Sequence, residues 1–203
     1  MAKFRASRFA IAAAVLAALT GTSFAAGVPS FQPPPGMTLT SGRPTNALQL
    51  RADSRLNPAF LRQIVRYSTR ERPGTVIVST GEHYLYLVLG NGRALRYGIG
   101  VAKSGFEWRG VHQVTRKAEW PGWTPPAEML QRRPELPRHM DGGPNNPLGA
   151  RALYLGSTLY RIHGTTEPWS IGHNVSSGCI RLTNSDVMDL YERVKLNTKV
   201  VVL

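Results

Sequence analysis

From residue 75 to its end, the chain consists of short runs in which apolar and polar residues alternate, separated by turns. Alternation with a period of two places successive side chains on opposite faces, as a half-buried β-strand requires. Residues 84–89 and 94–101 flank Gly90-Asn91-Gly92-Arg93, which predicts a β-hairpin. The other predicted strands cover residues 75–80, 152–155, 158–162 and 199–202. We therefore expect a mainly β fold.

Two segments have helical spacing instead. Apolar residues recur on one face over residues 187–194, and Thr183-Asn184-Ser185-Asp186 fits a capping box at the start of that helix. Residues 58–67 also place apolar side chains at helical spacing, with Asn57 as the cap. The expected fold is thus mainly β with one or two short helices.

Residues 1–25 have the pattern of a secretory signal peptide. Basic residues come first, an apolar run covers residues 9–19, and small residues follow over 23–26. An apolar run of this length is short for a membrane span, and a charged start with a small-residue exit is typical of cleaved signals. We expect export to the periplasm or cell wall. Contact with the membrane is expected only through an uncleaved signal.

The next segment, residues 26–72, is predicted to be a leader or linker that contains the short helix. Its first part, residues 27–45, is rich in proline and lacks any regular period. The chain carries 25 Lys and Arg against 12 Asp and Glu, and removal of the signal leaves a net charge of about +10. An exported basic protein meets anionic wall and membrane surfaces, so we expect no nucleic-acid partner.

Cys179 is the only cysteine of the chain. It cannot form an internal disulfide, so no disulfide framework exists. A free thiol in an oxidising compartment is a liability unless it is buried or used. The surrounding residues favour use.

The segment from Tyr160 to Leu182 holds a set of residues suited to nucleophilic catalysis. His163 ends a predicted strand, and Cys179 follows 16 residues later, after a loop. An imidazole that takes the thiol proton makes cysteine a good nucleophile. A glycine before the nucleophile, Gly178, lets a substrate carbonyl approach backbone N–H groups, and Arg181 supplies a charge for a carboxylate.

These residues resemble the signature of the L,D-transpeptidase catalytic domain, the YkuD-like family. The resemblance rests on Ile162-His163-Gly164-Thr165 and on Ser176-Ser177-Gly178-Cys179-Ile180-Arg181. It covers residues 73–203, including Asn146-Pro147-Leu148-Gly149, and does not cover the leader. It implies a β-sandwich-like domain over residues 73–203, with the cysteine at the mouth of a cleft.

The resemblance also implies roles for single residues. Cys179 attacks the stem-peptide carbonyl, His163 is its base, and the Gly164 carbonyl orients the imidazole. The N–H groups of Gly178 and Cys179 form the oxyanion hole. The substrate-binding candidates are Arg181, Ser177, Ser176 and Trp169. The implied reaction is peptidoglycan L,D-transpeptidation through an acyl-enzyme, from a tetrapeptide stem to an amine, without metal or cofactor.

Several alternatives stay open. Water as the acceptor would make the protein an L,D-carboxypeptidase, and an outer-membrane lipoprotein or other protein lysine would make it an anchoring or releasing enzyme. A basic wall-binding module without catalysis is the rival from another class. Sortase-like and papain-like enzymes place His and Cys at another spacing or in the opposite order. Many family members carry histidine where this chain has Ser177, and His173 is expected to face solvent.

Overall fold

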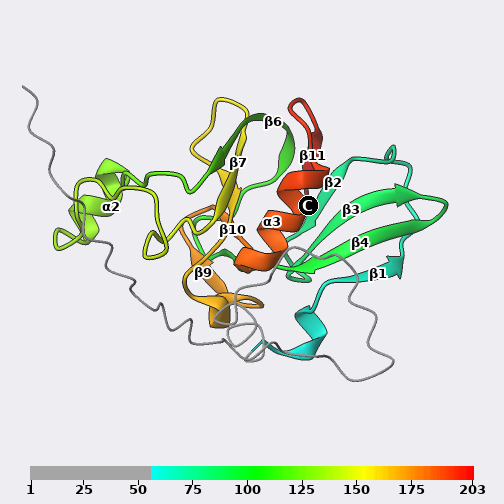
Figure 1. The fold of residues 1–203 in the computed structure, drawn as a ribbon, viewed down its shortest axis with the longest axis horizontal. Coiled ribbons are helices and arrows are strands. Elements are labelled where there is room, and N and C mark those ends of the chain that lie inside the picture. The colour runs from blue at the N-terminus through cyan, green and yellow to red at the C-terminus, as the bar shows by residue number, and fades with distance from the viewer. Residues whose placement is uncertain (1–55) are drawn as a thin grey trace, which may run out of the picture. The chain divides into compact units, whose positions relative to one another are not determined.

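The computed structural model describes residues 56–203. The predicted signal peptide and the leader up to residue 55 lie outside the described residues. In the described part, nine strands form one sheet and two short strands form a second sheet. Figure 1 shows how the strands and helices are arranged. The elements are η1 (Pro58–Phe60), β1 (Gln63–Arg66), β2 (Val76–Ser79), β3 (Tyr84–Gly90), β4 (Arg93–Gly98), β5 (Val101–Ala102), β6 (Gly110–Glu119), α2 (Ala127–Arg132), β7 (Arg151–Leu155), β8 (Arg161–His163), η2 (Pro168–Ser170), β9 (Asn174–Ser176), β10 (Ile180–Arg181), α3 (Asn184–Arg193) and β11 (Lys199–Val202).

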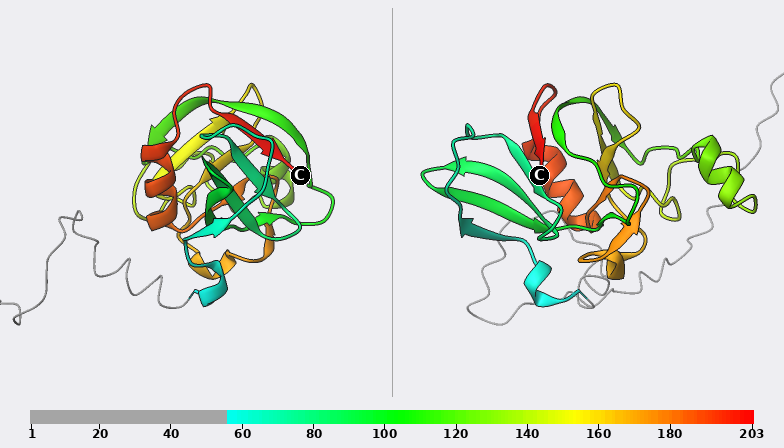
Figure 2. Two further views of the ribbon diagram at one scale, coloured as in Figure 1. Left: turned by 90° about the vertical axis from the view of Figure 1, so that its right-hand side faces the viewer. Right: turned by 180° about the vertical axis from the view of Figure 1, so that it is seen from behind.

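The long strand β6 joins two halves of the large sheet, whose order is β1-β4-β3-β2-β11-β6-β7-β8-β10. Its first part, from Gly110 to Gln113, pairs with β11, and its later part pairs with β7. The register shifts between Val114 and Arg116, where a bulge bends the strand. The two halves therefore face each other, which confirms the predicted mainly β, sandwich-like fold (Figure 2).

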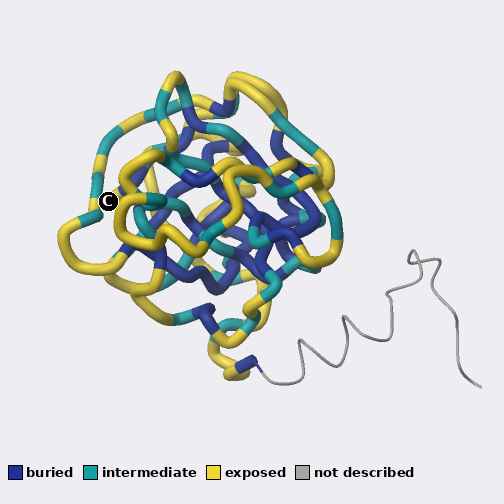
Figure 3. Tube along the Cα trace, turned by 90° about the vertical axis from the view of Figure 1, so that its left-hand side faces the viewer, coloured by how far each residue is buried: buried dark blue, intermediate teal, exposed yellow. Residues whose placement is uncertain are grey.

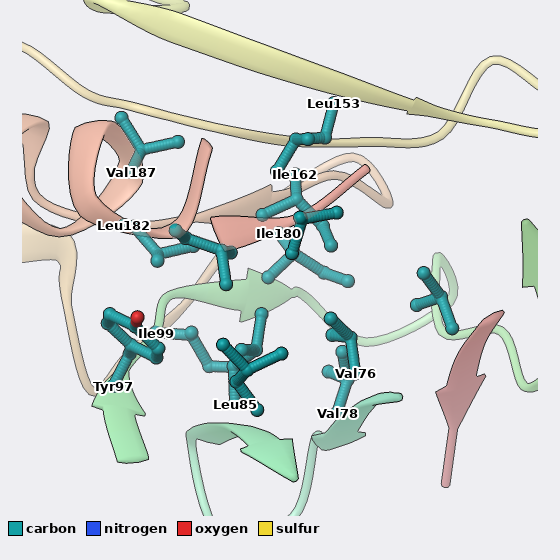
Figure 4. Packing of buried hydrophobic residues seen from close by; sticks show 14 of the residues in the cluster. Val76, Val78, Leu85, Tyr97, Ile99, Leu153, Ile162, Ile180, Leu182 and Val187 are labelled. Atoms are coloured by element: carbon teal, nitrogen blue, oxygen red, sulfur yellow. The ribbon is translucent and has the colours of Figure 1, made fainter. Parts of the chain in front are cut away.

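The main hydrophobic core lies between these halves. Leu153, Ile162 and Ile180 come from one half and meet Val76 and Leu85 from the other (Figure 4). All five are at most 2% exposed. Each buried aliphatic side chain of this size contributes about 1.5–3 kcal/mol relative to an exposed one. Buried residues fill the interior, and exposed residues occupy the outer loops (Figure 3).

Two local predictions are confirmed. The hairpin joins β3 to β4 through Asn91 and Gly92, whose φ values of 52° and 65° suit the tight turn that matches strand twist. The helix after the cysteine is α3. Its N-cap is Thr183, whose side chain accepts a hydrogen bond from the Asp186 N–H at 3.1 Å.

The helix predicted over residues 58–67 is wrong beyond Phe60. Asn57 does cap a turn, since its side chain accepts from the Ala59 N–H at 3.0 Å, but the turn is η1 alone. The following residues form β1, antiparallel to β4. Pairing with the open edge of β4 satisfies the backbone of this segment and overrides its helical spacing. The sheet therefore begins before residue 73, within the predicted leader.

Other boundaries also differ. The sequence did not predict β6, whose apolar residues lose their alternation at the bulge, or α2, which lies in the segment between β6 and β7. β8 starts at Arg161 because Thr158 forms a turn, its hydroxyl donating to the Leu155 carbonyl at 2.6 Å. The strand predicted over 94–101 ends at Gly98. Neither α-helix within residues 56–203 has the length and apolar character to cross a membrane.

Candidate active site

Two short parallel strands, β8 and β10, bring the predicted catalytic residues together. Ile180 pairs with Ile162, and Arg181 pairs with His163. Both isoleucines point into the core. Because side chains alternate along a strand, the residues on either side of them share the opposite face. Those residues are His163 and Arg161 on β8, and Arg181 with the preceding Cys179 on β10.

The imidazole of His163 is held in one orientation. Its side chain is buried, and Nδ1 lies 2.6 Å from the Gly164 carbonyl oxygen. A carbonyl can only accept, so Nδ1 carries the hydrogen and Nε2 has the free lone pair. Gly164 packs against the Asn184 side chain so closely that a Cβ there would collide with Asn184 Oδ1. A glycine is therefore required beside the histidine.

The pKa of His163 is lowered to about 3, and burial of the side chain is the largest cause. The positive charges of Arg181 and Arg161 contribute to this lowering of the pKa, while the backbone carbonyls of Gly164 and Leu148 act in the opposite direction. The ring is consequently neutral at neutral pH. A neutral imidazole with a free Nε2 lone pair can accept a proton.

The thiol of Cys179 is also neutral at rest. Burial raises its pKa, and the nearby charges of Arg161 and Arg181 oppose that shift. Sγ lies 3.9 Å from the Leu159 carbonyl oxygen. Within the described residues, no hydrogen bond joins this thiol to His163. The resting arrangement is therefore a thiol and a neutral imidazole on one face of the sheet.

The backbone before the cysteine is tightly constrained. Gly178 has a φ of +113°, and a Cβ there would lie 2.6 Å from the Tyr160 ring. Only glycine suits such a backbone conformation. The Tyr160 ring stacks on Trp108 at 4.1 Å, and Trp108 Nε1 donates to the Gly178 carbonyl at 2.6 Å.

Ser176 occupies the other side of this turn. Its buried hydroxyl donates to the Cys179 carbonyl at 2.6 Å and accepts from the Gly178 N–H at 3.2 Å. The Gly178 N–H is therefore already used, while the Cys179 N–H has no partner among residues 56–203. A trans peptide unit points its C=O and N–H in opposite directions. Because Trp108 holds the Gly178 carbonyl, the Cys179 N–H points away from Trp108.

The remaining predicted site residues lie around this turn and in the loop after β8. Arg181 forms an ion pair with Glu167 at 2.7 Å, which ties it to the loop after β8. The Trp169 side chain is 64% exposed, and no described contact joins it to Cys179. Ser177 is half-buried in the turn, and His173 is exposed.

Sequence reasoning missed Arg161, Trp108 and Tyr160. Arg161 could have been identified from the sequence, because alternation along Arg161-Ile162-His163 places it on the same face as His163. Trp108 had no local signal, because it lies 70 residues from the carbonyl that it binds.

A cavity of about 170 Å³ lies beside this turn. Its lining includes Trp108, Gly178 and Ile180, together with Glu107 and Asn174, and it includes neither Cys179 nor His163. Among the described residues, no group of three or more His, Cys, Asp or Glu side chains is placed to hold a metal ion.

The sequence is similar to that of proteins described as L,D-transpeptidases. The sequence model of the L,D-transpeptidase catalytic domain (YkuD) matches residues 73–202. A probable L,D-transpeptidase ErfK/SrfK of Escherichia coli strain K12 is 37% identical over 137 residues, covering 63% of this chain and 43% of that protein. A probable L,D-transpeptidase YbiS of the same strain is 38% identical over 135 residues, with the same coverage. The chain thus spans less than half the length of these curated relatives.

Solved structures share the fold. An L,D-transpeptidase from Mycobacterium smegmatis has a TM-score of 0.50 at 18% identity, covering 64% of this chain and 58% of its own. A crystal structure from Brucella melitensis, described as a probable carnitine operon oxidoreductase, is 46% identical and covers 74% of this chain and 98% of its own. Its TM-score is 0.49.

Proposed function

Because the chain belongs to the L,D-transpeptidase catalytic domain family, we propose that it transfers acyl groups of peptidoglycan stem peptides through Cys179. One observation carries this proposal. His163 has its tautomer set by the Gly164 carbonyl and shares a sheet face with the only cysteine. A fixed base beside a thiol is the arrangement that nucleophilic acyl transfer needs. The Gly164 carbonyl takes the orienting role that a carboxylate has in a Ser-His-Asp triad.

The first step is attack on the donor. Cys179 Sγ turns about χ1 from the Leu159 carbonyl towards His163, and Nε2 takes the thiol proton as Sγ adds to the donor carbonyl carbon. Proton transfer accompanies attack because both groups are neutral at rest. The scissile bond joins an L-centre to a D-residue in the tetrapeptide stem.

The negative charge that develops on the carbonyl oxygen is stabilised by the Cys179 N–H. This donor is unpartnered among residues 56–203, and Trp108 sets its direction through the Gly178 carbonyl. Preorganised donors of this kind cost no reorganisation during the reaction. The Gly178 N–H contributes only if Ser176 releases it.

Collapse of the intermediate forms the thioester. The C–N bond breaks, the leaving amine takes the proton from His163, and the terminal D-amino acid departs. An acceptor amine then attacks the thioester carbonyl and His163 takes its proton. The C–S bond breaks as the new amide forms, and His163 returns the proton to sulfur, which restores the thiol. We take the acceptor to be an amine of a second peptidoglycan stem, and the site of action to be the periplasm or cell wall.

Covalent labelling tests the nucleophile. A carbapenem presents a strained amide carbonyl, so incubation should add one drug mass to the protein, mapped by mass spectrometry to the peptide containing Cys179. The adduct should be absent in Cys179→Ala and should form about 10²–10⁴-fold more slowly in His163→Ala. Labelling that persists without Cys179, or no labelling of folded wild-type protein, would favour a wall-binding module.

The acceptor needs a separate experiment. Muropeptides released from sacculi of cells with and without the gene should differ in cross-links between stems. A change confined to tetrapeptide trimming would assign water as the acceptor, and a change confined to bound lipoprotein would assign a protein lysine.

A further inference from the structure

A row of four side chains crosses strands β6, β7 and β8 and ends at the candidate nucleophile, which directly precedes β10. Arg116 on β6 pairs with Tyr154 on β7, and Tyr154 pairs with Arg161 on β8. Cys179 lies in the next position, one residue before the Ile180–Ile162 pair. All four residues are on the face opposite the core residues Leu153, Ile162 and Ile180.

Tyr154 holds both guanidinium groups in place. The Arg116 Cζ lies 3.5 Å from the centre of its ring, and the Arg161 Cζ lies 5.6 Å from it. A guanidinium that stacks on an aromatic ring keeps its N–H groups free to bind an anion in the guanidinium plane. The two arginines are thus oriented before any ligand arrives.

Neither arginine has its charge neutralised within the described part of the chain. Arg161 donates through Nε and one terminal nitrogen to the Leu159 carbonyl, at 3.2 and 3.0 Å, which leaves its other terminal nitrogen for a ligand, and no acidic side chain pairs with it. Arg116 likewise has no acidic partner among residues 56–203. Arg181 differs, because Glu167 already occupies it at 2.7 Å. The uncompensated positive charge beside Cys179 therefore belongs to Arg161.

We propose that Arg161 and Arg116, held by Tyr154, form a carboxylate-binding subsite that runs from Cys179 across the sheet. Strands lie about 4.8 Å apart, which puts the Arg116 position about 14 Å from Cys179. An extended peptide of four residues spans about that length. The ligand is an acidic peptide, with one carboxylate near the reacting carbonyl and another about four residues away. Taking that peptide to be the stem peptide rests on the proposed function.

Alkylation of the single cysteine tests the role of Arg161 in the subsite and does not require enzymatic turnover. The Cys179 thiolate reacts with anionic iodoacetate and with neutral iodoacetamide. In both reactions an S–C bond forms and iodide leaves. The ratio of the two rates cancels the fraction of thiolate and reports the local attraction for a carboxylate. Arg161→Gln in the full chain should lower the iodoacetate-to-iodoacetamide ratio by about two- to fivefold, as for a half-exposed charge pair. Arg161→Lys should retain most of it.

Arg93→Gln, in the exposed β3–β4 hairpin, is the matched control because it removes the same charge elsewhere. The ratio should stay at the wild-type value in this variant. An unchanged ratio in Arg161→Gln, or an equal fall in Arg93→Gln, would overturn the Arg161 part of the subsite. Alkylation does not involve acyl transfer. Failure of the carboxylate subsite can therefore be distinguished from failure of the proposed acyl-transfer function.

A longer reagent tests the Arg116 part. Iodoacetyl-triglycine with a free carboxylate, compared with its carboxamide, places the charge about four residues from the reacting carbon. Arg116→Gln should lower the carboxylate preference for this reagent and leave the preference for iodoacetate unchanged. Equal effects on both reagents, or no effect on the longer one, would remove Arg116 from the subsite.

Discussion

Replacing Trp108 with phenylalanine removes one hydrogen-bond donor and keeps an aromatic ring against Tyr160. The lost bond is the 2.6 Å contact from Nε1 to the Gly178 carbonyl, and the stack at 4.1 Å can persist. A half-buried carbonyl left without its partner costs about 1–3 kcal/mol. The same hydrogen bond fixes the Gly178–Cys179 peptide plane and so directs the Cys179 N–H towards the oxyanion. When the transition state has to restore the orientation of that peptide plane, this free energy adds to the activation barrier, and acylation slows by about 5- to 150-fold.

Two reactions of the same cysteine separate this effect from general damage. Acylation by a carbapenem needs the oxyanion donor, whereas alkylation by iodoacetamide passes through no oxyanion. Both rates can be followed by intact-protein mass spectrometry under single-turnover conditions. We expect Trp108→Phe to slow acylation within the stated range and to leave alkylation within about twofold of wild type.

Trp120→Phe is the matched control, because Trp120 lies in a loop and its side chain is 43% exposed. It should change neither rate. The reasoning would be refuted if Trp108→Phe slowed both reactions equally, which would indicate a collapsed site. It would also be refuted if acylation kept the wild-type rate.

Two further predictions concern the buried histidine and the exported chain. The free energy of unfolding should fall as the pH drops from about 6.5 towards about 3, by up to about 1.4 kcal/mol per pH unit. In this pH range the imidazole of the unfolded chain binds a proton, whereas buried His163 stays neutral. Chemical denaturation at several pH values should show a shallower fall in His163→Gln, and identical slopes would contradict the assigned cause. The intact mass of secreted protein should show loss of residues 1–25, and a soluble cytosolic chain that retains Met1 would contradict export.

Local chemistry explains which elements were predictable. The hairpin depends on Asn91 and Gly92, which adopt the turn through their own backbone preferences. The start of α3 depends on Thr183 capping a residue three positions later. By contrast, residues 63–66 have helical spacing but form β1, since the open edge of β4 is available only once the hairpin has folded.

The mainly β fold, the family resemblance and the order of His163 before Cys179 could be read from the amino-acid sequence, and the resemblance implied the contact of the imidazole with the adjacent Gly164 carbonyl. Each depends on residues close together in the chain. The folded chain alone shows that Trp108 holds the Gly178 carbonyl and that Arg116, Tyr154 and Arg161 form one row leading to Cys179. These contacts join distant segments, and their register depends on the bulge in β6 and on the burial of Ile162 and Ile180. A strand shifted by one residue would turn its side chains to the other face, so the row exists only because core packing sets the register.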